Sequence, residues 1–595
     1  MVTYSAPLDD VRFDLFELFD YEGEVASLPG YEEAARDLVD AVLDEGARFC
    51  ENELMPLNRP GDEAGCIFEN GVVRTPEGFK EAYKAFAEGG WVGLACSPDY
   101  GGQGLPKTVQ FALDEFVCST NLSFGMYPGL SYGAYRALEL HGSDEQKQLY
   151  LPKLAEGTWS GTMCLTEPHC GTDLGLIRTK AEPNGNGAYK ISGTKIFISA
   201  GEHDLTENIL HLVLAKLPDA PPGTRGISLF LVPKFLVGAD GALGARNGVA
   251  CGAIEHKMGI KASSTCVMNF EEAEGYLVGA PHSGMKAMFT MMNAARLVVG
   301  IQGLGLAETA YQSAAAYAKE RLQGRALSGV KHPDQPADPI IVHPDVRKTL
   351  LTMRAYNEGA RALAIWVGMA LDIADKHPEP ERRQEADDLV ALMTPIIKAF
   401  LTDSGHEVTN MGVQVFGGHG YIRETGVEQL VRDARIAQIY EGANGIQALD
   451  LVGRKLPQHM GRLLRRFFHP VADFLEENQA EAELMEFVLP LAKAFGRLQQ
   501  ATAWVAQQGL RDPEEAGAAA SDYLRLFALV ALAYLWARAA KVALAKRDGE
   551  NGAFYQAKLA TARFYMTRLL PQSSALFAAI MAGAKPVMEP EEAWF

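Results

Sequence analysis

The first part of the chain shows a helical spacing of hydrophobic residues. From Tyr31 to about Leu154, apolar positions recur three and four residues apart, for example over 32–48 and 108–118. No strand pattern competes with these helices, and a Gly-rich stretch at 100–106 marks a turn between them. We therefore predict a helical domain in this part of the chain.

Strand-like patterns replace the helical spacing after this region. Runs rich in β-forming residues occupy 209–217 and 226–232. A third run, 189–199, follows a turn of Asn and Gly residues at 184–187, as a hairpin requires. We expect a small antiparallel β domain over about 160–280.

Long helical periods return after Met285. One of them places an apolar stripe on a single helix face, formed by Val346, Leu350, Met353, Ala360, Leu363, Val367 and Leu371. A boundary falls near 456–457, and the Ala- and Leu-rich region beyond it is expected to form a second helical unit. We therefore predict a mainly α fold with a central β domain. The predicted segments are an N-terminal extension (1–30), a helical domain (31–159), a β domain (160–280), a helical bundle (281–456) and a C-terminal helical domain (465–595).

Charge and cysteine content narrow the possible functions. The 595 residues include 55 Lys and Arg against 75 Asp and Glu, and the resulting charge of -20 disfavours binding to nucleic acid. The 8 cysteines form no CxxC pair and no histidines are grouped at metal-ligand spacing, so we expect reduced thiols and no metal site. The first residues are acidic and lack the pattern of a targeting peptide, which favours a cytoplasmic protein.

The most apolar stretch lies late in the chain, at 526–537, and is bracketed by Arg525 and Arg538. Its length falls well short of the roughly 20 residues that a helix needs to span a bilayer. We therefore expect a buried helix at this position and no membrane-spanning segment.

Glu441 is the first candidate for a catalytic residue. It follows an apolar stretch, so we expect its carboxylate where a helix ends. The next residue, Gly442, has no side chain and allows a close backbone approach. A carboxylate withdrawn from water there would have a raised pKa, as removal of a proton beside a carbonyl group requires. On these residues alone, a solvated Glu at the edge of a loop is the plainer interpretation.

Two further segments combine hydroxyl, aromatic and glycine residues. The segment 164–173 contains a Gly turn that supplies backbone N–H donors, which suit the polar edge of a planar ring or a pyrophosphate. The segment 191–201 places Phe197 and Ser199 on one strand face, because side chains alternate with a period of two. An ordinary strand and turn, and a core aromatic residue, are the alternative interpretations.

The segment around Glu441 resembles the signature of the acyl-CoA dehydrogenase family. Ile-Tyr-Glu-Gly at 439–442 follows Arg-Asp-Ala-Arg at 432–435, and Gln-Val-Phe-Gly-Gly-His-Gly-Tyr lies about twenty residues upstream. The resemblance implies a helical, β-barrel and helical-bundle architecture over about 31–455. It also implies that Glu441 is the general base that takes the α proton, with Gly442 beside the substrate.

The same resemblance implies FAD as the cofactor and indicates which residues bind it. Thr166 and Thr172 are expected to line the flavin. Phe197 is expected to pack on the ring, and Ser199 to face its N5 atom. Arg296 matches an Arg at the start of a long helix, near cofactor and substrate, for which a surface or helix-start Arg is the alternative interpretation. Three residues match positions that contact the FAD of a neighbouring subunit: Arg321, Gln414 and Gly418.

Some positions depart from the family pattern. The stretch 322–325 differs from the usual sequence after Arg321, which affects the local FAD contacts. Ala443 replaces the usual Thr, so one hydroxyl contact to the cofactor is expected to be missing or supplied by another residue. Ala295 stands where one branch of the family keeps its base, and this leaves Glu441 as the candidate.

The resemblance implies that two hydrogens are removed from the α and β carbons of an acyl-CoA thioester. Electrons would pass to the flavin and then to an electron-transfer flavoprotein. The N-terminal extension and the tail are similar to the long branch that includes bacterial fatty-acyl-CoA and 3-methylmercaptopropionyl-CoA dehydrogenases. We expect a homodimer. An acyl-CoA oxidase and a non-catalytic flavoprotein scaffold are the alternatives.

Overall fold

The computed structural model describes residues 2–595 and contains two compact units, each assembled from stretches that are separate in the sequence. The barrel unit comprises Arg48–Leu105 and Thr120–Val298. The bundle unit comprises the residues up to Ala47, Pro106–Ser119 and Val299–Phe595. Three helices contain residues of both units: α2 (Arg36–Phe49), α5 (Lys107–His141) and α7 (Gly284–Glu320).

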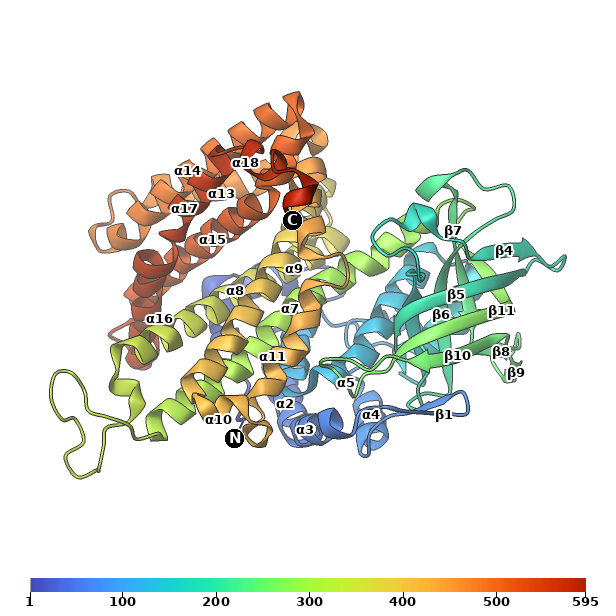
Figure 1. Cartoon of the computed structure of the whole chain (residues 1–595), viewed down its shortest axis with the longest axis horizontal. Coiled ribbons are helices and arrows are strands. Elements are labelled where there is room, and N and C mark those ends of the chain that lie inside the picture. Colours follow the sequence, from blue (N-terminus) through green and yellow to red (C-terminus); the bar gives the residue numbers. More distant parts are fainter. Residues whose placement is uncertain (1) are drawn as a thin grey trace. The chain divides into compact units, whose positions relative to one another are not determined.

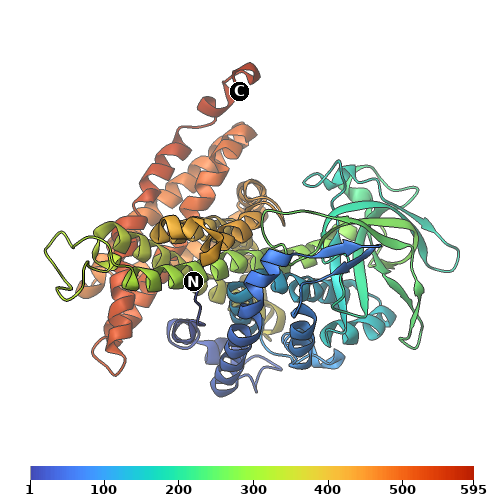
Figure 2. The same ribbon diagram turned by 60° about the horizontal axis from the view of Figure 1, so that its bottom comes forward.

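The barrel unit is centred on a seven-stranded sheet. Its strands are β3 (Trp159–Cys164), β4 (Lys180–Pro183), β5 (Tyr189–Ser199), β6 (Asn208–Lys216), β7 (Ile227–Pro233), β10 (Val249–Ile254) and β11 (Thr265–Val278). Strand β7 pairs with both β6 and β11, so that β11, β5, β4, β6 and β7 form a continuous ring. Figure 1 and Figure 2 both show these strands side by side.

The remaining elements of the barrel unit are short. They are α3 (Met55–Ala64), β1 (Ile67–Glu69), β2 (Val72–Arg74), α4 (Phe79–Glu88), α6 (Asp144–Ala155), β8 (Phe235–Val237) and β9 (Leu243–Arg246). Strands β6 and β7 are buried along nearly their whole length, which requires cover on both faces. Val213, Phe230 and Met268 belong to one apolar core, whereas Leu212 and Leu231 belong to another that includes Tyr135, Tyr150 and Trp159.

The structure confirms the predicted β region and its hairpin of β4 and β5, but two expectations were wrong. The hairpin of β1 and β2 interrupts the N-terminal region, where only helices were expected. Its turn, Asn70-Gly71, has positive φ at both residues, as a type I′ turn requires. The sheet is also not purely antiparallel, because β3 and β6 pair in parallel. The long segment between them supplies the crossover that a parallel pair needs.

The bundle unit contains the long helices that follow the barrel. Its elements up to residue 450 include α1 (Leu8–Phe13), α8 (Pro344–Lys376), α9 (Pro380–Phe416), α10 (Gly418–Tyr421), α11 (Val427–Arg435) and α12 (Asn444–Asp450). The predicted apolar stripe lies on α8, and its members Leu350, Met353 and Leu363 are buried. Glycines allow α7 to approach α9 closely, since a Cβ atom on Gly303 would lie 2.4 Å from the Leu401 carbonyl oxygen.

Six further helices complete the bundle unit. They are α13 (Arg462–Asn478), α14 (Met485–Arg511), α15 (Pro513–Lys546), α16 (Gly552–Phe564), α17 (Gln572–Met581) and α18 (Lys585–Met588). Figure 1 shows α15 among these helices, and the predicted burial of 526–537 is confirmed. Among residues 2–595, α15 alone has the length and apolar composition of a membrane span, and 83% of its most apolar window is buried inside the protein. Such burial is typical of the core helix of a bundle.

Candidate active site and cofactor-binding surface

Glu441 lies in a tight loop between two helical segments of the bundle unit. Helix α11 continues into a short 3-10 helix at Ile436–Gln438, and α12 begins at Asn444. Glu441 has φ 56° and Gly442 has φ 86°, so the backbone is left-handed at two successive residues. A non-glycine residue rarely adopts this conformation, and such strain is concentrated at functional sites. The predicted position of Glu441, beyond a helix end, is confirmed, and its side chain is half-buried.

Neighbouring helices hold this loop through side chains that the sequence did not single out. The Tyr440 hydroxyl donates a hydrogen bond to the Gln302 side chain on α7. The Gln447 amide of α12 donates to the carbonyl oxygens of Glu441 and Gly442, each at 3.2 Å. The spacing of Gln447 after the Glu-Gly pair, nearly one helix turn past the start of α12, is the signal that the sequence offered.

Asn444 fastens the start of α12 to α9. Its amide nitrogen donates to Asp403 Oδ1 at 2.7 Å and to Thr402 Oγ1 at 3.0 Å. Its amide oxygen accepts a hydrogen bond from the Lys398 ammonium at 2.8 Å, and Lys398 is fully buried. The loop that carries Glu441 therefore ends on a helix whose first residue is fixed by three side chains.

In the barrel unit, the segment 164–173 is joined to β5 by a buried ion pair. Lys195 Nζ lies 2.9 Å from Glu167 Oε1 and also donates to the Leu165 carbonyl oxygen at 2.9 Å. The Ile196 backbone N–H donates to the Thr166 carbonyl oxygen. These contacts bring Thr166 beside the strand that carries Phe197 and Ser199. All three residues are expected to bind the same cofactor.

The electrostatics of Glu167 favour its ionised form. Burial opposes ionisation, but the Lys195 ammonium and the Thr179 hydroxyl outweigh this effect and lower the pKa of the carboxyl group. Glu167 also accepts hydrogen bonds from the backbone N–H groups of Arg178 and Thr179. The buried contacts of Glu167 thus hold the segment 164–173 in place, and the solvent-facing side of the segment is left available to a ligand.

Phe197 presents an exposed aromatic ring on this surface. Its side chain is 60% exposed, whereas the adjacent Ile198 is buried in the barrel core. Strand β5 bulges at this point, because Lys195 pairs with Met268 and Ile198 with Cys266, and Phe197 has φ 58°. Phe197 and Ser199, which is partly exposed, flank the buried Ile198 on this strand. An exposed ring beside the Ser199 and Thr166 hydroxyls fits the face and the polar edge of a flavin.

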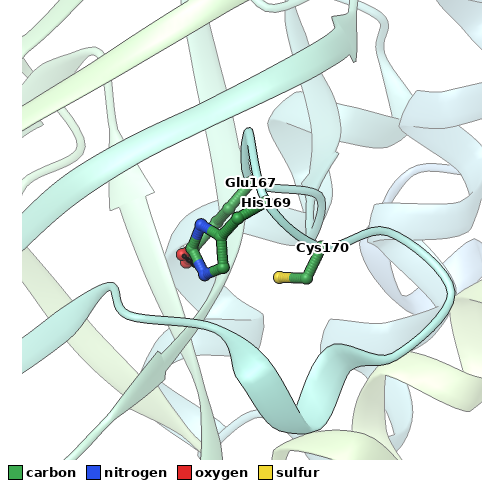
Figure 3. A group of neighbouring side chains, drawn as sticks. All are labelled: Glu167, His169 and Cys170. Carbon is green, nitrogen blue, oxygen red and sulfur yellow. Dashed lines mark ion pairs between the residues drawn. The ribbon is translucent and has the colours of Figure 1, made fainter.

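Glu167, His169 and Cys170 form a cluster that could be mistaken for a metal site. Their ligand atoms lie within 4.8 Å of one another. Figure 3 shows the three side chains. However, the His169 Nε2 atom lies 2.9 Å from the Leu176 carbonyl oxygen, so Nε2 carries a proton and only Nδ1 keeps a lone pair. Glu167 Oε1 already accepts hydrogen bonds from Lys195 and Thr179, and Oε2 accepts one from the Arg178 backbone N–H. Glu167 and His169 are therefore both engaged in local contacts of the fold.

Arg296 lies well inside α7, not at a helix start, because the helix already begins at Gly284. It is 7% exposed, its guanidinium lies 5.8 Å from the Phe289 ring centroid, and it donates to Asn293. The apolar and helix-forming residues before it extend the helix toward its N-terminus. The placement of Arg296 at a helix start, which the resemblance and the alternative interpretation shared, is therefore wrong, and so is the interpretation as a surface Arg.

Three other predicted cofactor residues lie together at helix ends in the bundle unit. Arg321 follows α7, Gln414 lies near the end of α9 and Gly418 begins α10, and all three are exposed. The Tyr317 ring stacks on Phe416 with centroids 4.2 Å apart, which joins these two helix ends.

The structure does not bring this group together with Glu441. Asp403, which binds the Glu441 loop through Asn444, precedes Gln414 on α9 by about three helix turns, or roughly 16 Å.

Four family descriptions match consecutive parts of the sequence. Residues 37–158 match "Acyl-CoA dehydrogenase, N-terminal domain", and residues 162–273 match the middle domain of the same family. Residues 282–456 match its C-terminal domain, and residues 467–591 match "Acetyl-CoA dehydrogenase C-terminal like".

Individual proteins resemble the chain over nearly its whole length. The 3-methylmercaptopropionyl-CoA dehydrogenase of Ruegeria pomeroyi is 46% identical, with 96% of this chain and 97% of that protein covered. A butyryl-CoA dehydrogenase of Syntrophomonas wolfei is 34% identical, with 99% of each chain covered. The fold matches that of a Bacillus anthracis acyl-CoA dehydrogenase solved with FAD, with a TM-score of 0.73, 22% identity and coverage of 98% of this chain and 92% of that one. The chain therefore belongs to the acyl-CoA dehydrogenase family of FAD-dependent oxidoreductases.

Proposed function

We propose that Glu441 is the general base of this enzyme and removes the α proton of an acyl-CoA thioester. The observation that carries the proposal is the strained backbone of Glu441, which neighbouring helices hold in place. A carboxylate on a fixed and partly water-shielded loop is suited to proton abstraction, because both its position and its basicity are controlled.

The backbone of the same loop has a second role in the proposal. The N–H of Glu441 would donate to the thioester oxygen, where negative charge develops as the α proton leaves. Gly442 would allow the thioester to approach the backbone closely, since it has no side chain. FAD, when bound, would supply the acceptor for the hydride from the β carbon.

The proposed FAD-binding residues of the barrel unit are Thr166, Thr172, Phe197 and Ser199. Phe197 would pack against the flavin ring, and the hydroxyl groups would donate to its polar edge. The exposed ring of Phe197 and the anchored segment beneath Thr166 support this role. Arg296 is proposed to lie near the cofactor and the substrate.

We propose a short acyl chain as the substrate, either 3-methylmercaptopropionyl-CoA or a short fatty acyl-CoA. Two of the relatives that span nearly the whole chain carry the names of enzymes for such substrates. A steady-state comparison of butyryl-CoA, 3-methylmercaptopropionyl-CoA and palmitoyl-CoA tests this. A highest kcat/KM with palmitoyl-CoA would contradict it.

We propose an electron-transfer flavoprotein as the electron acceptor and a homodimer as the functional assembly. Arg321, Gln414 and Gly418 are exposed and lie apart from the Glu441 loop, so they are available to the FAD of a neighbouring subunit. A cytoplasmic location agrees with eight free cysteines. Rapid peroxide release in air, compared with slow dye reduction under nitrogen, would instead favour an acyl-CoA oxidase.

The central experiment mixes the FAD-loaded enzyme with butyryl-CoA and 3-methylmercaptopropionyl-CoA under nitrogen. Bleaching of the visible flavin absorbance is expected for the unmodified protein. Glu441→Gln is expected to retain FAD and to lose bleaching by at least about a thousandfold. Glu424→Gln, at an exposed position outside the loop, serves as the control. Normal bleaching by Glu441→Gln would defeat the proposal.

A further inference from the structure

Gln447 occupies an unusual place beside the Glu441 loop. It lies in the first turns of α12, is 1% exposed, and uses both hydrogens of its side-chain amide on two successive carbonyl oxygens, those of Glu441 and Gly442. These are the two residues with left-handed backbone. One side chain therefore spans the strained part of the loop.

The orientation of the Gln447 amide is fixed by these two acceptors. Its Oε1 atom is buried and has no hydrogen-bond partner in the described part of the chain. Rotating the amide by half a turn would place that oxygen against two carbonyl oxygens, which is repulsive. The protein thus leaves one buried acceptor unsatisfied in order to keep two donors on the loop, although such an acceptor is costly.

The helix that carries Gln447 is also fixed in position. Asn444, one helix turn earlier, is bonded to Asp403 and Lys398 on α9. On the other side of Glu441, the Tyr440 hydroxyl is bonded to Gln302 on α7. The loop is therefore held at both ends, and Gln447 provides the contact to the peptide groups of Glu441 and Gly442 themselves.

We propose that Gln447 is a positioning residue for catalysis: its amide holds the Glu441 and Gly442 carbonyls and thereby sets the direction of the Glu441 carboxylate and backbone N–H. The proposal rests on the proposed role of Glu441. A left-handed Glu that loses this support can relax toward a commoner backbone conformation. Relaxation turns both the side chain and the N–H away from the substrate, so proton abstraction slows while substrate binding through the CoA moiety is kept.

The test substitutes Gln447→Met, which keeps the length of the side chain and removes both donors. A fall in kcat of at least about tenfold is expected, with FAD content unchanged and KM within about twofold of the unmodified enzyme. The matched control is Gln429→Met, which removes another buried amide on α11, 4% exposed and bonded to Asp433. The two variants are expected to lose similar thermal stability, and only Gln447→Met is expected to lose kcat.

A second variant, Gln447→Glu, has nearly the same shape and tests the direction of the hydrogen bonds. Its ionised carboxylate would repel both carbonyl oxygens, whereas the protonated form can donate one hydrogen bond. Its kcat relative to that of the unmodified enzyme is therefore expected to rise as the pH is lowered. If Gln447→Met does not fold, the pH dependence of kcat of Gln447→Glu tests the proposal by itself.

The proposal is overturned if Gln447→Met keeps kcat within about twofold, or if Gln429→Met loses as much. It is also overturned if the relative kcat of Gln447→Glu does not depend on pH. Parallel measurement of Glu441→Gln separates the two proposals. An active Glu441→Gln contradicts the role of Glu441 itself, while an inactive Glu441→Gln with a fully active Gln447→Met contradicts only the role of Gln447.

Discussion

The Lys195 ammonium lies 2.9 Å from the Glu167 carboxylate, and both side chains are closed off from solvent. Lys195 comes from β5 and Glu167 from the segment 164–173, so this pair joins the two parts of the barrel unit that are expected to bind FAD. Removing one member of a buried ion pair leaves an uncompensated charge and costs about 3–5 kcal/mol.

Lys195→Met is therefore expected to lower both the stability of the protein and its FAD content. Without the ammonium, the buried Glu167 carboxylate must either take up a proton or draw in water, and the segment that carries Thr166 loses its anchor. Thermal unfolding and the ratio of visible to ultraviolet absorbance of the purified protein measure the two effects.

The control for this variant is Lys190→Met on the same strand. Lys190 pairs with Glu272, but the side chains are 40% and 69% exposed, and such a solvated pair contributes little to stability. Its FAD content should remain normal. An equal loss of FAD in the two variants would show that the Lys195–Glu167 pair has no special role.

Lys558 links the C-terminal helices to the rest of the bundle unit through buried charges. On α16, it is 2% exposed and donates to Glu358 of α8 at 2.9 Å, and it also pairs with Asp10 of α1. Lys558→Met should destabilise the protein by up to about 3–5 kcal/mol, because two carboxylates lose one cationic partner each and keep only Arg354 and Arg361. Lys546→Met removes an exposed pair with Glu17 and should cost less than about 1 kcal/mol. Comparable denaturant midpoints for the two variants would contradict this account.

Asp14 gives a prediction for the effect of pH. Burial raises the pKa of its carboxyl group from 3.8 to about 8, although Lys558 and Arg361 favour the ionised form. The contribution of Asp14 to stability is therefore complete below about pH 4 and is lost as the pH rises toward 8, by up to about 1.4 kcal/mol for each pH unit. Asn does not titrate, so the Tm of Asp14→Asn relative to that of the unmodified protein should increase from pH 5 to pH 8. A difference in Tm that does not change with pH would contradict the raised pKa.

Much of the fold follows from periodicity. The stripe on α8, the strands β6 and β7 and the buried run in α15 were all predicted at their positions, because long regular segments carry a strong signal. The hairpin at Asn70-Gly71 was missed, since strands of three residues are too short to show alternation, although the Asn-Gly pair is itself a turn signal.

The contacts that hold the Glu441 loop in place could not be predicted from periodicity. Gln302 and Tyr440 are 138 residues apart, and their contact depends on how closely α7 approaches the loop. The parallel pairing of β3 with β6 likewise depends on the path of the chain between them. Single residues such as Glu441 and Phe197 were identified by resemblance, but their left-handed backbone is a property of the folded chain.

The most direct test of the account follows exchange of the acyl α protons in D₂O under nitrogen, with an excess of butyryl-CoA over FAD-loaded enzyme and no electron acceptor. Reversible proton removal by Glu441 predicts that the unmodified enzyme introduces deuterium at the α carbon, and that Glu441→Gln with the same FAD content does so at least about a thousandfold more slowly. Exchange by Glu441→Gln at the rate of the unmodified enzyme would show that another group takes the proton.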